Sequence, residues 1–397
     1  MKSEDRMEYE LNIKRTYIFR FLHHLHFFSG VLIPFFTIWG GISFFQVMIL
    51  QAFFTLSVFI LEIPTGVIAD KYGRRTSLIL AGIVTSMAAI VYSSYPSFWV
   101  FMAGEVLWAI GSSLISGADQ AMIYDSLREL GREKESKKIY GRWNSIGLAS
   151  IGIAAPIGSL IAEYMGLRYT MMFMSIPLLL AGLYAFSFKE PEVGRIQKKE
   201  KYLDTLKEGV KYFKNHKILK ILAFDFVLIG SISFFIIWVY QVVLQNLGIS
   251  IKWFGFVAAG IVFVQIVVLN SFGFFERVFR GKKNYLFFTA IITGLGFIAI
   301  GLSKNVYLSI VMILLVGAFG LTRKPLLQNY MNKFIESHNR ATVLSTVSML
   351  YMFTAAVLNL VWGYLVDWNL KYTLVLIGSL IIVITIVSRI EEEHLVD

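Results

Sequence analysis

The chain has 397 residues, of which 56% are hydrophobic and only 16% are charged. Soluble domains carry about a quarter charged residues, so this composition indicates an integral membrane protein. The chain contains no cysteine, which excludes disulfides and thiolate metal sites. The net charge of +11 is spread between apolar runs rather than gathered in one domain, which favours attraction to anionic membrane lipids over nucleic-acid binding.

Twelve apolar runs follow one another along the chain, and each is long enough to cross ~30 Å of hydrocarbon as a helix. We therefore predict an all-α integral membrane protein with twelve transmembrane helices in two pseudo-symmetric six-helix bundles. The predicted limits of the spans are 17–39, 43–68, 76–95, 97–127, 142–165, 168–188, 218–244, 251–274, 284–303, 306–331, 341–365 and 370–389. The predicted domains are an N-terminal bundle (1–188), a cytoplasmic linker (189–217) and a C-terminal bundle (218–397).

Basic residues are distributed unevenly between the two sets of joins that connect these spans. Of the 37 Lys and Arg, only Arg168, Lys252, Lys304 and Lys371 fall at one set of joins. The other 33 lie on the tails, on the opposite loops or near those ends of the spans. The positive-inside rule therefore predicts that both termini are cytoplasmic. Met1–Arg15 is charged and polar, so we expect a tail there rather than a cleavable signal.

The predicted linker contains a short amphipathic pattern. Tyr202, Leu206, Val210 and Phe213 recur at helical spacing. This spacing favours a helix that lies along the membrane surface. A solvated linker between the two halves is the alternative.

The join between the second and third spans is short and carries several charges. It contains Gly66, Asp70, Lys71, Gly73, Arg74 and Arg75. This pattern resembles the signature loop between helices 2 and 3 of the major facilitator superfamily, and every fixed position of that loop is matched. The resemblance implies a secondary active transporter that works by alternating access, with the two six-helix halves rocking about a central site.

A weak internal repeat agrees with two related halves. Gly41-Ile42-Ser43 precedes the second span and Gly248-Ile249-Ser250 precedes the eighth, 207 positions later. The loop after the eighth span, Glu276 to Arg280, resembles an altered copy of Asp70 to Arg74. This plan is typical of pseudo-symmetric transporters.

The fifth span contains a run of small residues, Gly152 to Gly158, with Pro156 inside it. The run is similar to the Gly-Pro-Gly pattern of proton-coupled exporters in the same superfamily, although Ala155 stands where those exporters have glycine. The alternative interpretation is a kinked helix whose small residues allow close packing.

Ionisable residues inside the membrane are functional candidates, because a charge at that depth is costly. The resemblance implies that spans one, four, seven and ten line the central cavity. Our proton-coupling candidates are Asp119, Glu105 and Asp225, with Asp119 preferred. Glu105 and Asp119 are 14 residues apart, which predicts that both lie on one face of a continuous fourth helix.

The resemblance also implies a conformational switch at the signature loop. Asp125, near the end of span four, is expected to pair with Arg74 or Arg75, and Glu62 is expected to support that network. A metal site formed by His23, His24 and His26 is not predicted, because adjacent histidines on a helix point to different faces.

The remaining candidates concern the transported solute. The expected cavity residues are His24, Phe27, Trp108, Trp238, Gln241, Arg323, Lys324 and Gln328, with the aromatic side chains of Phe35 and Phe235. No nucleotide-binding, nucleophile or zinc motif is present in the sequence, so neither an enzyme nor a cofactor is predicted.

The predicted function is proton-coupled efflux of drug-like compounds by a monomer in the cell membrane. The predicted partners are a small-molecule substrate, protons and membrane lipids, without nucleic acid. One alternative is uptake of an anionic nutrient held by Arg323 and Lys324. Another is a non-transporting receptor or lipid-handling protein on the same fold.

Overall fold

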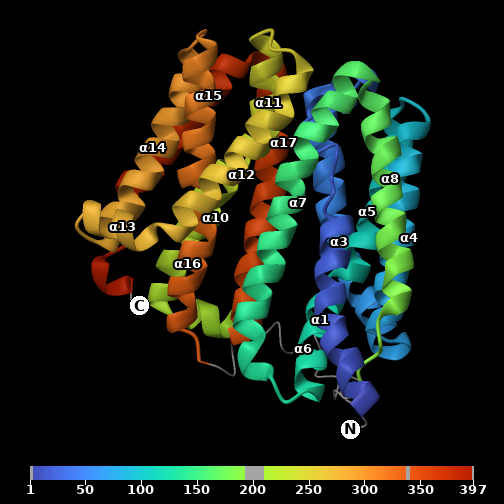
Figure 1. The fold of residues 1–397 in the computed structure, drawn as a ribbon. Helices are drawn as coiled ribbons and strands as arrows, with labels where there is room; N and C mark the ends of the chain where they lie inside the picture. Colours follow the sequence, from blue (N-terminus) through green and yellow to red (C-terminus); the bar gives the residue numbers. More distant parts are fainter. Residues whose placement is uncertain (1–2, 193–209, 337–339, 396–397) are drawn as a thin grey trace. The chain divides into compact units, whose positions relative to one another are not determined.

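A computed structural model describes residues 3–192, 210–336 and 340–395 (Figure 1). The described chain is helical apart from its joins, which confirms the predicted all-α class. It forms two compact units. Unit 1 contains the helices up to residue 192 together with Ser250–Ala259, and unit 2 contains the rest of the described chain. Placing Ser250–Ala259 in unit 1 departs from the predicted halves, because these residues belong to the eighth span.

Ten helices in the described residues are long and apolar enough to cross a membrane. They are Phe44–Glu62, Arg74–Ser94, Phe98–Glu129, Glu133–Tyr164, Leu167–Ser187, Lys217–Asn246, Ile251–Asn270, Lys282–Leu302, Val306–Lys333 and Thr342–Val387. The last of them covers both of the final two predicted spans, and its backbone is non-helical at Asn369 (φ −163°, ψ 106°). Twelve spans therefore remain a prediction.

The first predicted span, 17–39, is not one helix. α1 (Ser3–His23) begins inside the stretch expected to be a simple tail. After turns at 24–31, the chain continues as α2 (Leu32–Pro34) and the π-helical turn η1 (Phe35–Trp39). Within α1 the buried Asn12 amide donates to Ser126 Oγ (3.1 Å) and to the Lys189 carbonyl (2.8 Å). These long-range contacts explain why the N-terminal residues are helical and packed.

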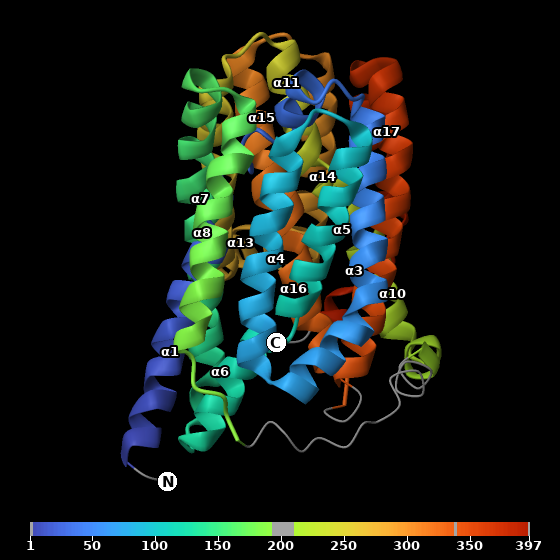
Figure 2. The same ribbon diagram turned by 90° about the vertical axis from the view of Figure 1, so that its right-hand side faces the viewer.

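The other long helices of unit 1 run side by side, as Figure 2 shows for α3, α4, α5 and α8. Their bounds are α3 (Phe44–Tyr72), α4 (Arg74–Ser94), α5 (Phe98–Ile115), α6 (Ala118–Glu129), α7 (Ser136–Tyr164) and α8 (Leu167–Tyr184). Ser43 precedes α3 and forms a capping box with Gln46. The Ser43 side chain accepts from the Gln46 backbone N–H, and the Gln46 side chain accepts from the Ser43 backbone N–H. α4 packs against both α5 and α8, so it lies at the centre of the unit.

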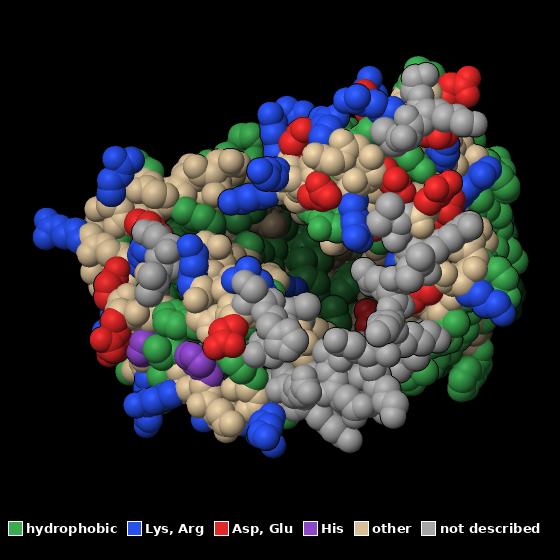
Figure 3. Space-filling model, turned by 90° about the horizontal axis from the view of Figure 1, so that it is seen from below, with side chains coloured by type: hydrophobic (Ala, Val, Ile, Leu, Met, Phe, Trp, Pro, Cys, Tyr) green, Lys and Arg blue, Asp and Glu red, His purple; other side chains and the backbone are tan. Residues whose placement is uncertain are grey.

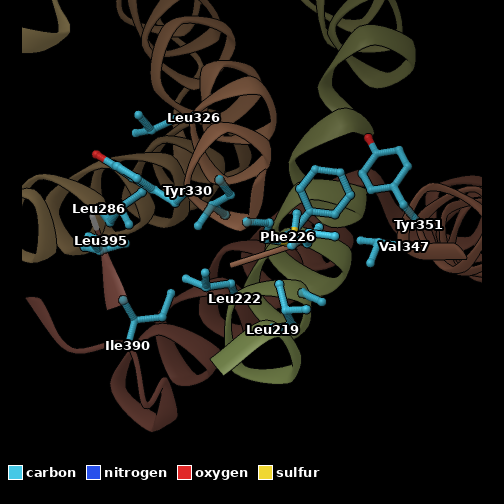
Figure 4. Close-up of a cluster of buried hydrophobic side chains, with 14 of the residues drawn as sticks. Leu219, Leu222, Phe226, Leu286, Leu326, Tyr330, Val347, Tyr351, Ile390 and Leu395 are labelled. Atoms are coloured by element: carbon cyan, nitrogen blue, oxygen red, sulfur yellow. The ribbon is translucent and has the colours of Figure 1, made fainter. Parts of the chain in front are cut away.

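Unit 2 is built mainly around α14 and α17, which pack together along their lengths. The helices from residue 217 onward are α10 (Lys217–Phe234), α11 (Ile236–Asn246), α12 (Phe254–Asn270), α13 (Phe272–Val278), α14 (Lys282–Leu302), α15 (Val306–Leu315), α16 (Leu321–Lys333) and α17 (Arg340–Val387). A core cluster that includes Leu222, Phe226, Tyr330 and Tyr351 joins α10, α16 and α17 (Figure 4).

Two of the four residues in the predicted amphipathic pattern, Tyr202 and Leu206, lie outside the described residues. Residues 210–215 are helical, and Phe213 packs against the core cluster of unit 2. This part of the pattern therefore contacts protein. Lys and Arg side chains, with Asp and Glu among them, gather on the face drawn in Figure 3. The cytoplasmic location of this face remains a prediction from the charge count.

Candidate functional site

The signature loop is a one-residue hairpin at Gly73, which ends α3 and precedes α4. Gly73 has a φ of +96°, a conformation that residues with a Cβ rarely adopt. A Cβ at this position would also lie 2.6 Å from the carboxyl carbon of Glu190. Both the backbone conformation and the available space therefore require glycine.

Glu190 caps the first turn of α4. Its carboxylate accepts hydrogen bonds from the backbone N–H groups of Arg74 (2.7 Å) and Arg75 (2.8 Å). The first N–H groups of a helix have no partner within the helix, and they lie at its positive end, so a carboxylate there is stabilising. Glu190 is not among the predicted switch residues, although it lies three residues after the helical turn Ala185–Ser187.

The arginine side chains extend the contacts of the loop. Arg74 pairs with Asp70 (2.8 Å) and lies 3.9 Å from the buried carboxyl group of Asp125, the predicted partner of Arg74 or Arg75. Arg75 donates to the Phe186 carbonyl (2.6 Å). The loop is therefore tied to both α6 and the end of α8.

Three other predicted switch residues lie apart from these contacts. Glu62 is exposed and hydrogen-bonds with Ser116, and none of the described contacts joins it to Arg74 or Arg75. Lys71 lies over the ring of Tyr72 (5.3 Å). A Cβ at Gly66 would meet open space. We expected Glu62 to support the arginine network, but among the described contacts it bonds to Ser116 at the C-terminal end of α5 instead.

Unit 2 also contains a helix whose first turn is capped by a carboxylate. Glu392 accepts from the backbone N–H groups of Lys282 and Lys283, each at 2.8 Å, at the start of α14. Gly281 precedes these lysines with a φ of +138°. The predicted copy of the signature loop, Glu276 to Arg280, was therefore placed slightly too early. An acid that follows the last helix of each half is the sequence signal that would have revealed both caps.

Removing either carboxylate should loosen only the helix that it caps. We expect Glu190→Ala to speed hydrogen exchange in the first turn of α4 and leave α14 unchanged, whereas Glu392→Ala does the opposite. Loss of a helix cap costs roughly 1 kcal/mol, about a fivefold change in local opening. Hydrogen exchange read by mass spectrometry measures the effect, and each variant is the control for the other. Equal changes in both helices would contradict separate caps.

A second group of polar side chains in unit 1 surrounds Arg20. Arg20 Nη1 lies 3.6 Å from Asp119 Oδ2, and its guanidinium lies 3.6 Å from the centre of the Trp143 ring. Gly147 leaves room for Arg20, because a Cβ there would lie 2.7 Å from Arg20 Nε. Asp119 is buried in the first turn of α6 and also accepts from the Gln120 backbone N–H (2.7 Å). We call Arg20, Asp119, Trp143 and the nearby His23, His24 and His26 the Arg20 cluster.

The three histidines come together because α1 ends at His23. His24 and His26 stack with ring centres 5.5 Å apart, and His23 lies 6.2 Å from His26. Trp108 packs edge-on against His26 at 5.7 Å. The prediction that these histidines point to different faces is wrong, since it assumed a continuous helix. No group of three His, Asp or Glu side chains in the described chain has the arrangement of a metal site.

Several buried nitrogens of the Arg20 cluster have no hydrogen-bond partner among the described residues. They include Arg20 Nε, His23 Nδ1 and Trp143 Nε1. A buried polar group without a partner costs roughly 1–3 kcal/mol. The cluster therefore has unused hydrogen-bonding capacity that water or a solute can meet.

Glu105 and Asp119 do not share a helical face. α5 ends at Ile115 and α6 begins at Ala118, so the intervening turn breaks the helical phase on which the prediction depended. Glu105 is buried between helices, where Gln51 Nε2 donates to it (3.2 Å) and Tyr92 hydrogen-bonds with it. Asp119 instead contacts Arg20 of α1.

Unit 2 has its own buried ion pair. Asp225 Oδ1 accepts from Arg323 Nη2 at 2.6 Å, and the two residues are 3% and 2% exposed. Arg323 also donates to Thr289 Oγ1 (2.5 Å) and to the Leu286 carbonyl. These contacts occupy both terminal nitrogens of Arg323, whereas its Nε has no hydrogen-bond partner among the described residues.

The other predicted cavity residues fall into several environments. Lys324 lies 4.2 Å from the ring centre of Tyr351, and Gln328 is half-buried on the same helix. Trp238 packs against Phe234, and Gln241 is almost fully buried in α11. Phe35 and Phe235 are fully buried core residues rather than cavity-lining ones.

The small residues of α7 lie against two other segments of unit 1. A Cβ at Gly158 would come within 1.6 Å of the Phe27 carbonyl oxygen, and α7 continues through Pro156. Ser159 Oγ donates to the Lys252 carbonyl (2.8 Å), and Glu163 accepts from Ser250 Oγ (2.8 Å). Close packing is therefore the role that the structure supports for this run. We call the contact of Ser159 and Glu163 with Ser250 and Lys252 the α7 junction.

Comparison with known proteins identifies the family. The sequence profile of the Major Facilitator Superfamily matches residues 21–352. The chain belongs to the major facilitator superfamily. It is 24% identical over 312 residues to the uncharacterized MFS-type transporter YxaM of Bacillus subtilis (strain 168), with 76% of each chain covered. It is also 24% identical over 246 residues to the nitrite extrusion protein of the same organism, which covers 60% of this chain and 58% of that protein.

Solved structures agree with this assignment of the major facilitator fold. Two crystal structures of nucleoside transporter NupG superpose with TM-scores of 0.82 and 0.79 at 10% and 11% identity. Each covers 95% of this chain and 98% of the NupG chain. This major facilitator protein is therefore a multi-pass membrane transporter for a small solute and not an enzyme.

Proposed function

We propose that this major facilitator protein exports small organic, drug-like solutes in exchange for protons. In this proposal twelve spans form two six-helix bundles, 1–188 and 218–397, joined by 189–217. Both termini lie in the cytoplasm, and the protein acts as a monomer in the cell membrane. The distribution of Lys and Arg between alternate joins supports this topology.

The observation that carries the proposal is the Arg20 cluster. It combines a buried carboxylate, a guanidinium 3.6 Å away and three neighbouring imidazoles. Charges at membrane depth are rare and usually serve a transport pathway. Asp119 is the proposed proton carrier, because it is the carboxylate of the cluster and it pairs with Arg20. The aromatic faces of Trp108 and Phe28 beside His26 suit a planar organic solute.

Uptake of an anionic nutrient is the second candidate. It requires free cations in the second half of the chain, but Arg323 already pairs with Asp225 and Lys324 lies over Tyr351. The name of one relative, nitrite extrusion protein, describes outward transport by that protein. Both observations favour export. A non-transporting receptor on the same fold is the third candidate.

The contacts of the signature loop support a role in conformational switching. Arg74 and Arg75 tie the loop to Asp125, Glu190 and the end of α8. Exchanging these ion pairs and hydrogen bonds during transport would allow the loop to favour one conformation over the other. We therefore propose that the loop controls the rate of transport rather than the affinity for solute.

Transport into inverted membrane vesicles distinguishes the three candidates. A ligand-stabilisation screen first identifies a compound that raises the melting temperature of the purified protein. A proton-coupled exporter should then accumulate that compound when the vesicle interior is made acidic. Accumulation driven by an acidic exterior would indicate uptake instead. Binding without gradient-dependent flux would indicate a receptor, and either outcome would overturn the proposal.

A further inference from the structure

Unit 2 contains a pocket that the transport proposal does not use. Its volume is about 260 Å³, and it lies between the beginning of α14 and the end of α17. Lys283, Asn284 and Phe287 line it from α14, Ser388 and Ile390 line it from the other side, and Arg323 lines it from within the unit. We call it the lateral pocket.

The lateral pocket joins an exposed rim to a buried interior. Lys283, Asn284 and Phe287 are exposed, whereas Arg323 is only 2% exposed. Ile390 and Leu286, which also line the pocket, belong to the core cluster shown in Figure 4. The pocket is therefore a built feature of the unit rather than a gap between loose side chains.

The depth of the pocket matches the headgroup region of a bilayer. Lys283 is the second residue of α14, and Phe287 follows one turn later, ~6 Å along the helix axis. The headgroup layer is roughly 5–7 Å thick on each side of the hydrocarbon. When Lys283 lies among the headgroups, Phe287 lies at the start of the acyl chains. Ile386 and Val387, next to Ser388, are 69% and 64% exposed and extend the apolar rim.

The polar groups that line the pocket are one carboxylate, that of Asp225, and several donors. Lys283 already contacts Glu391, and Arg323 already contacts Asp225, so each cation has one carboxylate partner. Arg323 Nε, however, has no hydrogen-bond partner among the described residues. Asn284 and Ser388 add neutral donors at the rim. Phosphate oxygens accept from all of these groups.

We propose that the lateral pocket binds the phosphate headgroup of an anionic phospholipid from the surrounding leaflet. The acyl chains lie outside against Phe287, Ile386 and Val387, and the phosphodiester lies between Lys283, Asn284 and Ser388. A lipid is the source rather than a soluble anion, because the exposed apolar side chains continue directly from the polar rim. This site is separate from the Arg20 cluster and does not depend on the direction or coupling of transport.

Native mass spectrometry of the purified protein tests this site. The protein in detergent is titrated with phosphatidylglycerol, with phosphatidylcholine and with glycerol phosphate. We expect one phosphatidylglycerol to be retained in preference to the other two. One basic residue near a membrane contributes about a fivefold change in anionic-lipid binding, so Lys283→Gln should weaken retention about fivefold. Ser388→Phe, which fills the pocket without changing charge, should weaken it at least as much.

Lys282→Gln is the matched control. It removes the same charge from the adjacent position of α14, but Lys282 does not line the pocket. Retention by this variant should stay within about twofold of the unchanged protein. Equal losses in Lys282→Gln and Lys283→Gln would show general attraction to the surface and overturn the site. Unchanged retention by Ser388→Phe, or equal retention of glycerol phosphate, would also overturn it.

Discussion

Replacing Asp119 with asparagine should abolish transport driven by a pH gradient, down to the level of vesicles without protein. Asparagine keeps the shape of the side chain but cannot carry a proton. Solute binding and solute–solute exchange should remain measurable, because neither requires net proton movement. Flux under an imposed gradient, measured beside exchange in the same vesicles, separates the two effects.

Two controls make this result interpretable. Asp119→Asn leaves the partly buried Arg20 without its carboxylate. Loss of one partner of a buried ion pair can destabilise a protein by about 3–5 kcal/mol, which is an upper bound here. The double variant Arg20→Gln with Asp119→Asn removes both charges and should recover the melting temperature without recovering coupling. Glu105→Gln removes a different buried carboxylate, which contacts Gln51 rather than Arg20, and should leave coupling intact. Gradient-driven accumulation by Asp119→Asn would show that another group carries the proton.

Cross-linking the α7 junction should stop transport. Glu163 and Ser250 contact each other at 2.8 Å, although they lie in different halves of the sequence. Ser250 belongs to unit 1 in this structure but to the second half of the sequence. Alternating access needs the two halves of the sequence to move, so a covalent link here should hold the present conformation. Because the chain contains no cysteine, Glu163→Cys and Ser250→Cys can be joined selectively with a short, cleavable bifunctional thiol reagent. Turnover should fall to background and return after cleavage.

The control for this experiment is a link inside one helical turn. Ser43→Cys and Gln46→Cys replace the two partners of the α3 capping box, which stay together within one element. Their cross-link should leave turnover largely unchanged. Each single-cysteine protein treated with the reagent controls for modification alone. Full transport by the linked Glu163→Cys and Ser250→Cys protein would mean that the α7 junction does not open.

The helices and the signature loop were the most predictable parts of this molecule. Apolar runs predict membrane helices, because exposing the backbone or polar side chains to lipid is unfavourable and this free-energy cost depends on local sequence. Gly73 was predictable as well, because its positive φ belongs to a tight turn between two spans. The tail at the N-terminus was mispredicted, since its helix depends on Asn12 contacting Ser126 and Lys189. Local periodicity does not predict contacts between residues so far apart in the sequence.

The geometry of the candidate sites was harder to predict than their residue types. His24, Trp108 and Asp119 were chosen because their side chains are unusual inside a membrane. Their grouping depends on the end of α1 at His23 and on the break before α6, which no local pattern specified. Glu190 was missed for a related reason. It caps a helix that begins more than a hundred positions earlier, so only the folded chain brings the two together.

Membership of Ser250–Ala259 in unit 1 has a consequence for synthesis of the protein. Asn12 and Glu190 close the N-terminal bundle only after residue 190 has emerged, and α7 gains its partner only after residue 259. A ribosome adds about 5–20 residues each second, so the second event follows the first by several seconds. During this interval Ser159 and Glu163 lack their partners on the eighth span. The nascent N-terminal bundle therefore exposes these polar side chains of α7 to the bilayer for several seconds. We expect membrane-protein insertion factors that cover exposed polar surfaces to bind during this time.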